Sequence, residues 1–499
     1  MRSKALKTCY FILSLFFIFF ISGCGININL DPYKDGKTPE NDFTLSNFLN
    51  NNMILQQDKE FTISGISEKG VVLTASIFDE EGDMVSQTIT IAGELGQFEL
   101  KVKGIAGSNK RYRLEVSDGF HTHKFKNIMF GEVWMISGEY KDTLSYSMDT
   151  DDANLDNIKF VQYENESLKW YSYEDAVNVS DNIKSFAAYL NTKVNIPIAI
   201  IDASLDECYA DAWLKEDIAT NYLNIKKYLT SINRYNTSNS TSSTNSLGSM
   251  YNIFIDSLKD FSIAGIIWNQ GTSDFKHYNS QNRGSFVTNY SYLLLQMFTE
   301  FNNVFGNDID IYTIQETYLD EAFANDLRFA QAIPSYQLEN VELIVTYDTY
   351  LLETEELINE DIESEQEGQY AFSIEKYLLR VCESVYQITY NKNAMFKSPA
   401  FNEVLTNNNV IKISFSFGQN LENVDELYGL SVQNSSAELL EYTYQINGNS
   451  IIITLVLEEN QDINDIECII TYAYVEEIYL CNLKTINGLP VVPFEIKIN

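Results

Sequence analysis

The hydrophobic and polar positions divide the chain into three stretches with different periods. Between residues 45 and 128, apolar and polar side chains alternate in short runs separated by turn residues. These runs lie at 61–64, 71–78, 85–91, 98–102 and 112–116. A period of two is typical of strands that bury one face and expose the other. The pattern therefore predicts an N-terminal β-sandwich-like domain at 45–128.

From residue 129 the apolar runs become continuous and alternate with helical segments. The continuous runs lie at 196–201, 263–268, 309–314 and 341–345. Segments with a helical period lie at 290–305, 323–336 and 365–386. Strands buried on both faces and interspersed with helices predict a parallel sheet in an α/β domain, here at 129–395. Such sheets bind ligands at the carboxyl ends of their strands.

The third stretch, 396–499, returns to β patterning and predicts a C-terminal β-sandwich-like domain. Its strand-like runs lie at 410–417, 451–457 and 468–474. Within the α/β domain, residues 236–249 consist almost entirely of Asn, Ser and Thr, a composition that predicts a flexible loop.

The N-terminus reads as an export signal rather than as part of the fold. Arg2, Lys4 and Lys7 precede an apolar run at 10–21 that is short for a membrane span. The letters Ile-Ser-Gly-Cys that end at Cys24 resemble a bacterial lipobox, which implies removal of 1–23 and lipidation of Cys24. We therefore expect an exported protein, lipid-anchored to the bacterial cell membrane or cell surface, with a polar tether at 24–44. The alternative is an ordinary signal peptide with an incidental cysteine.

The charge and the cysteine content exclude several classes of binding partner. Without the three cations of the signal, 31 Lys and Arg face 70 Asp and Glu, a net charge of about −39. This charge argues against nucleic acid and against adhesion to anionic headgroups. The cysteines after Cys24 form no CxxC pair and have no histidines at metal spacing, so neither a metal site nor a cofactor is predicted. Cys468 and Cys481 form a disulfide or remain buried thiols; the sequence leaves both open.

Five blocks of sequence then occur together in one order. They are "NNMILQQDKEFTISG" (51–65), "GEVWMISG" (131–138), "IPIAIIDAS…ADAW" (196–213), "MYNIFIDSLKDFSIAGIIWNQG" (250–271) and "ITYAYVEEIYLCNLKTINGLPVVPF" (470–494). The chain resembles the sialate O-acetylesterase family, a carbohydrate-esterase branch of the SGNH hydrolases, over 45–494. The resemblance implies a flavodoxin-like hydrolase core with accessory β domains. It also implies removal of O-acetyl esters from sialic acids or related sugars by a serine, a histidine and an aspartate.

At two short motifs, 137–141 and 361–364, the chain departs from the family at the positions that carry the chemistry. The family's Ser-Gly-Gln-Ser-Asn corresponds here to Ser-Gly-Glu-Tyr-Lys, so Glu139 replaces the glutamine and Tyr140 occupies the nucleophile position. The family's Asp-Ile-His-Pro corresponds to Asp-Ile-Glu-Ser, so Asp361 is retained and Glu363 stands at the histidine position.

Two further motifs, in the blocks 196–213 and 250–271, contribute to substrate and oxyanion binding in the family. The glycine pair whose backbone donates to the oxyanion corresponds here to Asp206 and Glu207. The Tyr-Gln-Gly-Glu block corresponds to Asn-Gln-Gly-Thr, which keeps Gln270 and Gly271 as candidate binding residues.

These departures predict that the inherited mechanism cannot run. A serine attacks an ester only when a base removes its proton and donors stabilise the oxyanion. Loss of the nucleophile or the base costs roughly six decades in rate. A rewired site would need Tyr140 as nucleophile, as in some sialidases, or a base at His277. Ser137 precedes the turn and is expected to stabilise it, and His121 and His123 are expected on the surface of a strand.

Two further interpretations of the site residues remain open. Glu139, Asp206, Glu207, Asp361 and Glu363 would converge on one cleft, as a cation site or a raised-pKa acid, or simply through drift toward the chain's acidic composition. Among the aromatic residues, Trp134, Trp213 and Trp268 would either stack on a sugar or pack the framework. Trp134, Glu139 and Asp206 are therefore candidate binding residues.

The sequence favours a sialate O-acetylesterase-like surface lipoprotein that has lost its Ser/His machinery and acts as a glycan-binding or structural protein. O-acetylated sialic acid or another glycan is the expected partner. One alternative is an active carbohydrate O-acetylesterase with a rewired site. A second is a surface scaffold with an unused cleft.

Overall fold

The computed structural model describes residues 43–46, 48–139, 146–148, 151–235, 244–276, 283–316, 324–352, 370–434, 436–457 and 466–498. Cys24, Tyr140, His277, Asp361 and Glu363 lie outside these ranges, as do the signal, most of the tether and residues 236–243. Contacts divide the chain into two compact units. The first holds the described residues of 43–46, 62–102 and 110–127, and the second holds 48–61, 103–109 and everything from Ile128. The predicted mixture of α and β structure in several sheets is confirmed.

The first unit is built from antiparallel strands, as the period-two pattern predicts. Its strands are β1 (Thr44–Leu45), β3 (Phe61–Ile66), β4 (Val72–Phe78), β5 (Met84–Ile91), β6 (Gln97–Val102), β7 (Ser108–Ser117) and the start of β8 (Thr122–Gly138). β1, β3 and β6 form one sheet, and β4 pairs with β5 and β7. Alternate residues of β6 are buried and exposed, so one face of the strand supplies Phe98, Leu100 and Val102 to the core. His121 and His123 are exposed.

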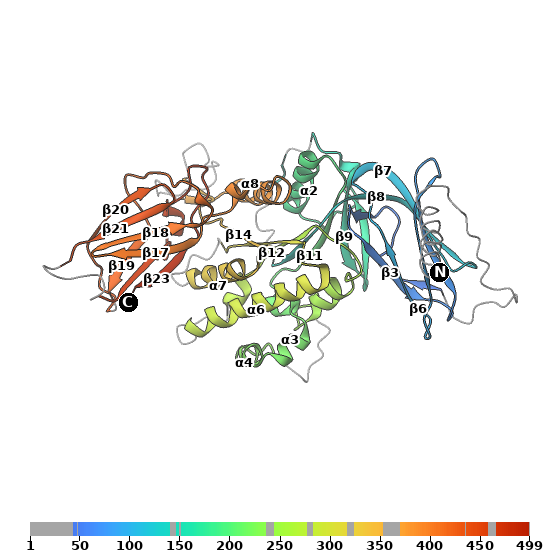
Figure 1. Ribbon diagram of the computed structural model, residues 1–499, viewed down its shortest axis with the longest axis horizontal. Coiled ribbons are helices and arrows are strands. Elements are labelled where there is room, and N and C mark those ends of the chain that lie inside the picture. Colours follow the sequence, from blue (N-terminus) through green and yellow to red (C-terminus); the bar gives the residue numbers. More distant parts are fainter. Residues whose placement is uncertain are drawn as a thin grey trace, which may run out of the picture. The chain divides into compact units, whose positions relative to one another are not determined.

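β8 is the longest strand, and its second half is the centre of a parallel sheet in the second unit (Figure 1). The order is β10-β9-β11-β8-β12-β13-β14, and every neighbouring pair is parallel except β10 with β9. The partners of β8 are β9 (Ile158–Glu164), β10 (Ser167–Ser172), β11 (Ile198–Ser204), β12 (Gly265–Asn269), β13 (Asp310–Ile314) and β14 (Val341–Ile344). Four of these strands match the predicted continuous apolar runs.

A short strand fixes the entry of β8 into this sheet. β2 (Ile54–Gln56) pairs in parallel with β8 at Met129–Gly131. The side chain of Gln56 accepts from Val133 N and donates to the buried carboxylate of Glu132, at 2.8 and 3.1 Å. The first two blocks of the sequence resemblance are therefore held together by backbone and side-chain bonds.

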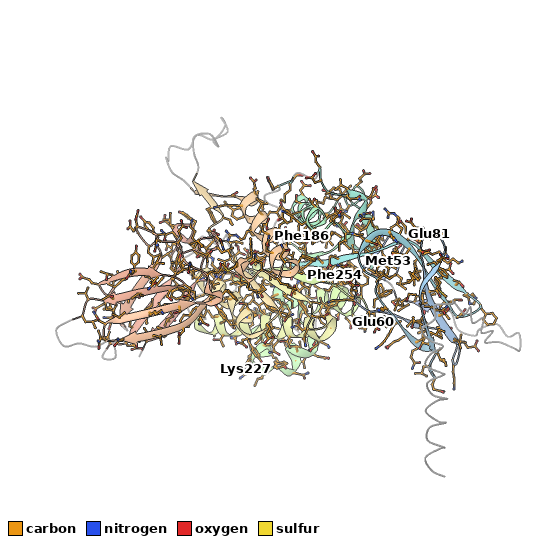
Figure 2. The ribbon with its side chains drawn as sticks, turned by 45° about the horizontal axis from the view of Figure 1, so that its top comes forward. Met53, Glu60, Glu81, Phe186, Lys227 and Phe254 are labelled. Carbon is orange, nitrogen blue, oxygen red and sulfur yellow. The ribbon has the colours of Figure 1, made fainter. Side chains whose placement is uncertain are left out.

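Helices cover both faces of the parallel sheet (Figure 1). They are α2 (Asp181–Val194), α3 (Glu216–Asn221), α4 (Leu223–Ser231), α5 (Thr272–Phe275), α6 (Arg283–Phe305), α7 (Ala324–Gln337) and α8 (Ile374–Val385). Trp134 and Ile267 share one core with Phe186 of α2 and with α8. Trp268, the next residue along β12, packs instead against Phe298 of α6. Figure 2 labels Phe186 and also Phe254, which stacks on Trp213 on the Trp268 side.

The segment 365–386 is only partly helical, which corrects the predicted single helix. In its described part, β16 (Tyr370–Phe372) pairs with β15 (Tyr350–Leu352) before α8 begins. The hydroxyl of Ser373 caps α8 by accepting from Lys376 N at 3.3 Å. A helical period alone cannot detect this strand pairing, because Tyr and Phe fit both periods. α2 was not expected, although Ser180 caps its first turn.

The C-terminal strands form two antiparallel sheets. They are β17 (Phe401–Asn407), β18 (Val410–Phe415), β19 (Leu430–Asn434), β20 (Tyr442–Asn447), β21 (Ser450–Leu455), β22 (Cys468–Tyr472) and β23 (Phe494–Ile498). The orders are β17-β18-β21-β20 and β19-β22-β23. Side chains of both sheets share one core that includes Ile411, Ile453 and Ile470. Cys468 and Cys481 are free, buried thiols, as are Cys208 and Cys382.

Among the described residues, no helix combines the length and the apolarity needed to span a membrane.

Gly138 ends β8 in a conformation and a space that only glycine fits. Its φ is +94°, and a Cβ there would lie 2.3 Å from the carbonyl oxygen of Asn269. Gly488 also has a positive φ, +81°, but a Cβ there meets nothing within 4 Å. We expect Gly488→Ala to lower the free energy of unfolding by about 1–2 kcal/mol through backbone strain alone.

Gly138→Ala should cost clearly more than Gly488→Ala, because the added methyl also forces β8 and β12 apart. Denaturant unfolding followed by tryptophan fluorescence would measure both changes. Equal losses in the two variants would contradict the close approach of the strands.

Candidate functional site

Three of the resemblance blocks meet at the carboxyl ends of adjacent parallel strands. Gly138 at the end of β8 lies in register with Ser204 of β11 on one side and Asn269 of β12 on the other. The backbone N–H of Leu205 donates to the Gly138 carbonyl at 3.0 Å, which extends the β8–β11 contact past the last strand residue. The loops that follow the three strands therefore start side by side, where an α/β sheet places its ligand site.

Glu139 turns inward at this edge and binds the start of α5. Its side chain is only 5% exposed. One carboxylate oxygen accepts from the backbone N–H of Ser273 at 2.8 Å, and the other accepts from the Ser273 hydroxyl at 2.5 Å. The two bonds tie the loop after β8 to the loop after β12, and they commit both donors of Ser273 to a carboxylate of the protein itself.

Gln270 is also committed to the protein. The side chain is 2% exposed, and its amide nitrogen donates to the carbonyl of Cys208 at 2.9 Å and to Asp274 Oδ2 at 2.7 Å. Its carbonyl oxygen accepts from the Cys208 thiol at 3.4 Å. Both amide hydrogens therefore connect the β12 loop to the β11 loop, and neither points to a ligand.

Gly271 follows in a confined position. A Cβ there would lie 2.9 Å from the side-chain nitrogen of Gln331 and 3.0 Å from Leu327, so α7 packs directly against this backbone. Gln331 Nε2 donates to the Gln270 carbonyl at 2.7 Å. The glycine therefore serves close packing between the β12 loop and α7.

The side chains of Asp206 and Glu207 face solvent instead of joining this buried network. Both are exposed, and the Glu207 side chain is 81% exposed with Lys276 Nζ 3.9 Å from its carboxylate. The φ of Glu207 is +52°, a left-handed conformation that glycine adopts more readily than glutamate. This is one of the two positions at which the resemblance places a glycine.

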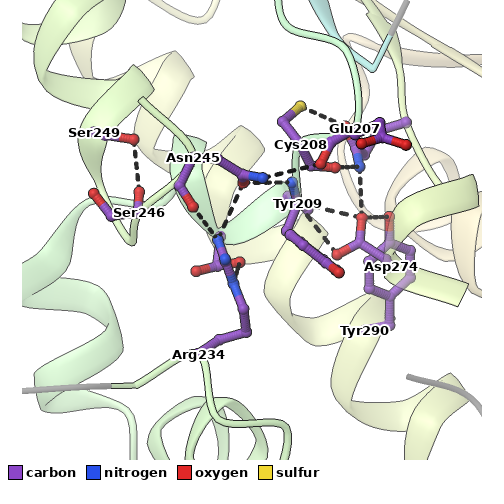
Figure 3. A network of polar contacts seen from close by, with 12 residues as sticks. Glu207, Cys208, Tyr209, Arg234, Asn245, Ser246, Ser249, Asp274 and Tyr290 are labelled. Carbon is purple, nitrogen blue, oxygen red and sulfur yellow. Dashed lines mark hydrogen bonds and ion pairs between the residues drawn. The ribbon is translucent and has the colours of Figure 1, made fainter. Parts of the chain in front are cut away.

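An arginine network holds this loop from behind (Figure 3). Arg234 Nε donates to the buried carboxylate of Asp211 at 2.8 Å, and its Nη2 donates to the Asn245 carbonyl at 2.7 Å. Asn245 in turn donates to the Glu207 carbonyl at 2.9 Å and accepts from Tyr209 N at 3.1 Å. Arg234, just before the Asn-, Ser- and Thr-rich segment 236–249, and Asn245, within it, thus position the β11 loop.

Asp274 is the second buried acid beneath the loop (Figure 3). Besides Gln270, it accepts from the backbone N–H of Ala210 at 3.2 Å and from the hydroxyl of Tyr290 at 3.2 Å. Burial raises the pKa of Asp274 to about 7, and the nearby negative charge of Asp211 adds to the effect. Burial also raises the pKa of Asp211 to about 6, although the Arg234 guanidinium opposes this rise.

The tryptophans at the strand ends are part of the core. Trp134, Trp213 and Trp268 are all buried. The indole N–H of Trp134 donates to the hydroxyl of Tyr390 at 2.8 Å. Trp134 therefore packs against helices and offers no face to a sugar. Ser137 is buried as well, and its hydroxyl donates to the Ile267 carbonyl of the next strand at 3.4 Å.

The candidate triad positions lie outside the described residues. These are Tyr140, Asp361 and Glu363, together with His277, so their convergence with Glu139 stays a prediction. Within the described ranges, no group of three His, Cys, Asp or Glu side chains is arranged to hold a metal ion.

The sequence analysis missed the residues that hold the site together. They are Asp211, Arg234, Ser273 and Asp274. Asp211 lies inside the "ADAW" block, and Asp274 follows Gln270 by four residues. Gln270 precedes α5, so helical spacing gives no signal for the Gln270–Asp274 pair.

Comparisons with known proteins support the architecture. A carbohydrate acetylesterase from Xanthomonas citri, XAC1771, superposes with a TM-score of 0.64 over 91% of this chain and 99% of its own, at 16% identity. The chain has the fold of this carbohydrate acetylesterase.

Two other structures share smaller parts. An Arabidopsis thaliana protein, AT4G34215, covers 52% of this chain and 98% of its own at 11% identity with a TM-score of 0.33. NanS covers 44% of this chain and 80% of its own at 10% identity with a TM-score of 0.26. No protein-family model and no curated protein sequence matches the chain.

The raised pKa of Asp274 predicts how stability changes with pH. Its pKa rises from 3.8 in the unfolded chain to about 7 in the folded one. Between these values the folded state holds a proton that the unfolded state has released, so the Asp274 contribution to the free energy of unfolding falls as the pH rises. We expect Asp274→Asn to flatten this fall between pH 4 and 7.

Denaturant unfolding at several pH values would measure the slope, with Asp217→Asn as a control at an exposed aspartate of α3. An unchanged slope in Asp274→Asn would contradict the assignment of this proton to Asp274.

The Arg234–Asp211 pair predicts a large loss of stability when only one partner is removed. We expect Arg234→Met to lower the free energy of unfolding by about 3 kcal/mol, because it leaves the buried Asp211 without its cation. The double variant Arg234→Met with Asp211→Asn should recover part of this loss. Lys259→Met is the control, since its pair with Asp256 is exposed and should contribute less than about 1 kcal/mol. An equal effect of the two single Lys and Arg variants on thermal unfolding would refute the prediction.

Proposed function

We propose that this protein is a glycan-binding member of the carbohydrate-esterase fold that has lost ester hydrolysis. The observation that carries the loss of hydrolysis is the pair of bonds from Ser273 to the Glu139 carboxylate. The fold shared with a carbohydrate acetylesterase supports a carbohydrate as the ligand class.

The chemistry of the strand-end site argues against oxyanion stabilisation. An oxyanion hole needs donors that are free when negative charge develops on the substrate. Here the Ser273 donors and both amide hydrogens of Gln270 are already used. A substrate oxyanion would also approach the negative charge of Glu139. Donors and charge therefore oppose the tetrahedral intermediate.

The strand order supports a finer assignment of the fold. With β9 and β10 set aside as additions at the β11 edge, the remaining strands β8, β11, β12, β13 and β14 are numbered 1 to 5 along the chain. Across the sheet they follow the order 2-1-3-4-5, the flavodoxin-like arrangement. Together with the sequence blocks, this order favours an SGNH hydrolase core of the sialate O-acetylesterase type.

The sequence further suggests a lipid anchor at Cys24, an exported location, and three domains at 45–128, 129–395 and 396–499. The ligand is a glycan, with O-acetylated sialic acid as one candidate.

Two rival functions make different predictions. A rewired esterase would use His277 as base and would turn over acetyl esters. A surface scaffold would neither hydrolyse esters nor bind glycans.

We expect no enzymatic release of acetate from an O-acetylated sialic acid or from 4-nitrophenyl acetate. With the nucleophile and base positions both substituted, the rate should fall by roughly six decades relative to an active triad enzyme, to the buffer rate. Acetate release by the full chain and by His277→Ala would be measured side by side.

Turnover well above buffer that disappears in His277→Ala would overturn the loss of hydrolysis and establish the rewired site. Absence of signal on a glycan array, with no turnover, would instead favour the scaffold.

A further inference from the structure

A groove of about 580 Å³ opens in the C-terminal β region, away from the strand-end site. It lies at one end of the β19–β22–β23 sheet. Tyr428 and Gly429 come directly before β19, and residues 474–477 come just after β22, with Leu480 and Cys481 completing the wall. Its volume is within the range of sites that hold a small ligand.

Two tyrosines at the groove are fixed by bonds from their surroundings. The backbone N–H of Tyr428 donates to the side chain of Asn482 at 3.0 Å, and the hydroxyl of Tyr428 donates to Glu426 at 3.0 Å. Asn482 also donates to the Glu426 carbonyl at 2.8 Å, so it holds the segment on both sides of Leu427. The hydroxyl of Tyr474 donates to Asp326 of α7. Fixing a ring before binding lowers the entropy that binding costs.

Tyr428 is fixed and yet remains 48% exposed. A large aromatic ring gains free energy when it is covered, and an anchored one that stays open presents a ready contact face. Gly429, which also lines the groove, has a φ of +86°, and a Cβ there would lie 2.3 Å from the Cys481 sulfur. This part of the lining therefore requires a glycine packed against a buried thiol.

The charges at the rim select the ligand class. Glu476 and Glu477 are exposed at the groove, and carboxylates accept hydrogen bonds but donate none when ionised. They repel anions and accept from hydroxyl groups. An apolar ring face beside carboxylate acceptors matches a neutral sugar, which offers C–H groups on one face and hydroxyl donors at its edge.

We infer that this groove is a binding site for a neutral oligosaccharide, stacked on Tyr428 and hydrogen-bonded to Glu476 and Glu477. The inference is independent of the strand-end site, because it uses none of the residues of that site. A polyamine is the competing ligand class, since carboxylates also attract cations and tyrosine rings hold them.

The test titrates the full chain with neutral β-1,4-linked tetrasaccharides of glucose, xylose, mannose and N-acetylglucosamine, and with spermidine. Calorimetry is the readout. We expect saturable binding of at least one tetrasaccharide, weakened about tenfold or more by Tyr428→Ala, because an anchoring aromatic carries much of the binding energy. Tyr428→Phe keeps the ring face and should bind within about twofold of the original chain.

Phe417→Ala is the matched control, since Phe417 is 46% exposed in the same region but does not line the groove. It should leave binding unchanged. Circular dichroism of Tyr428→Ala checks that the variant remains folded.

Failure of all four tetrasaccharides to bind would overturn the inference, as would binding that survives Tyr428→Ala. Tyr428-dependent binding of spermidine without sugar binding would assign the groove to cations instead. Acetate release by the full chain would overturn the proposed loss of hydrolysis without affecting this result.

Discussion

The parallel pairing of β8 with β11 on one side and β12 on the other is the constraint on which the candidate site depends. Parallel strands end at the same edge of a sheet, so the loops after these three strands must start together whatever side chains they carry. The close approach at Gly138 and the bond from Leu205 to its carbonyl keep this edge tight. The site is therefore a property of the backbone first and of its side chains second.

At this edge, the polar groups of the three loops form hydrogen bonds with one another. Glu139 takes the donors of Ser273, and Gln270 uses its amide on Cys208 and Asp274. A buried polar group without a partner is costly, so these internal bonds stabilise the loops. The same bonds leave the Ser273 donors and the Gln270 amide hydrogens unavailable to a ligand.

The sequence predicted the sheet well because its signal is local. Continuous apolar runs such as 196–201 and 263–268 are buried strands of the second unit, and the alternating runs of the first unit are its antiparallel strands. The prediction of one helix over 365–386 was partly wrong, because β16 pairs with β15, a strand about 20 residues earlier in the sequence.

The contacts of the site depend on such long-range relations throughout. The partner of Glu139 is Ser273, 134 positions away. Asp211 is buried and Arg234 is partly buried, whereas composition alone assigns charged residues to the surface. The resemblance predicted that Glu139, Asp206 and Glu207 converge on one cleft with Asp361 and Glu363, but it could not state which atoms bond.

The path of the β11 loop at Glu207 is set by contacts of the backbone and not by the side chain. A left-handed glutamate costs about 1–2 kcal/mol relative to a relaxed conformation, so surrounding contacts must hold it. Asn245 does so by bonding to the Glu207 carbonyl, and Arg234 holds Asn245. Because the side chain itself points to solvent, glutamate can stand at this position without changing the path of the loop. A chain can thus keep the outline of an esterase site while its charge and donors change, which is why likeness of fold and competence in catalysis must be argued separately.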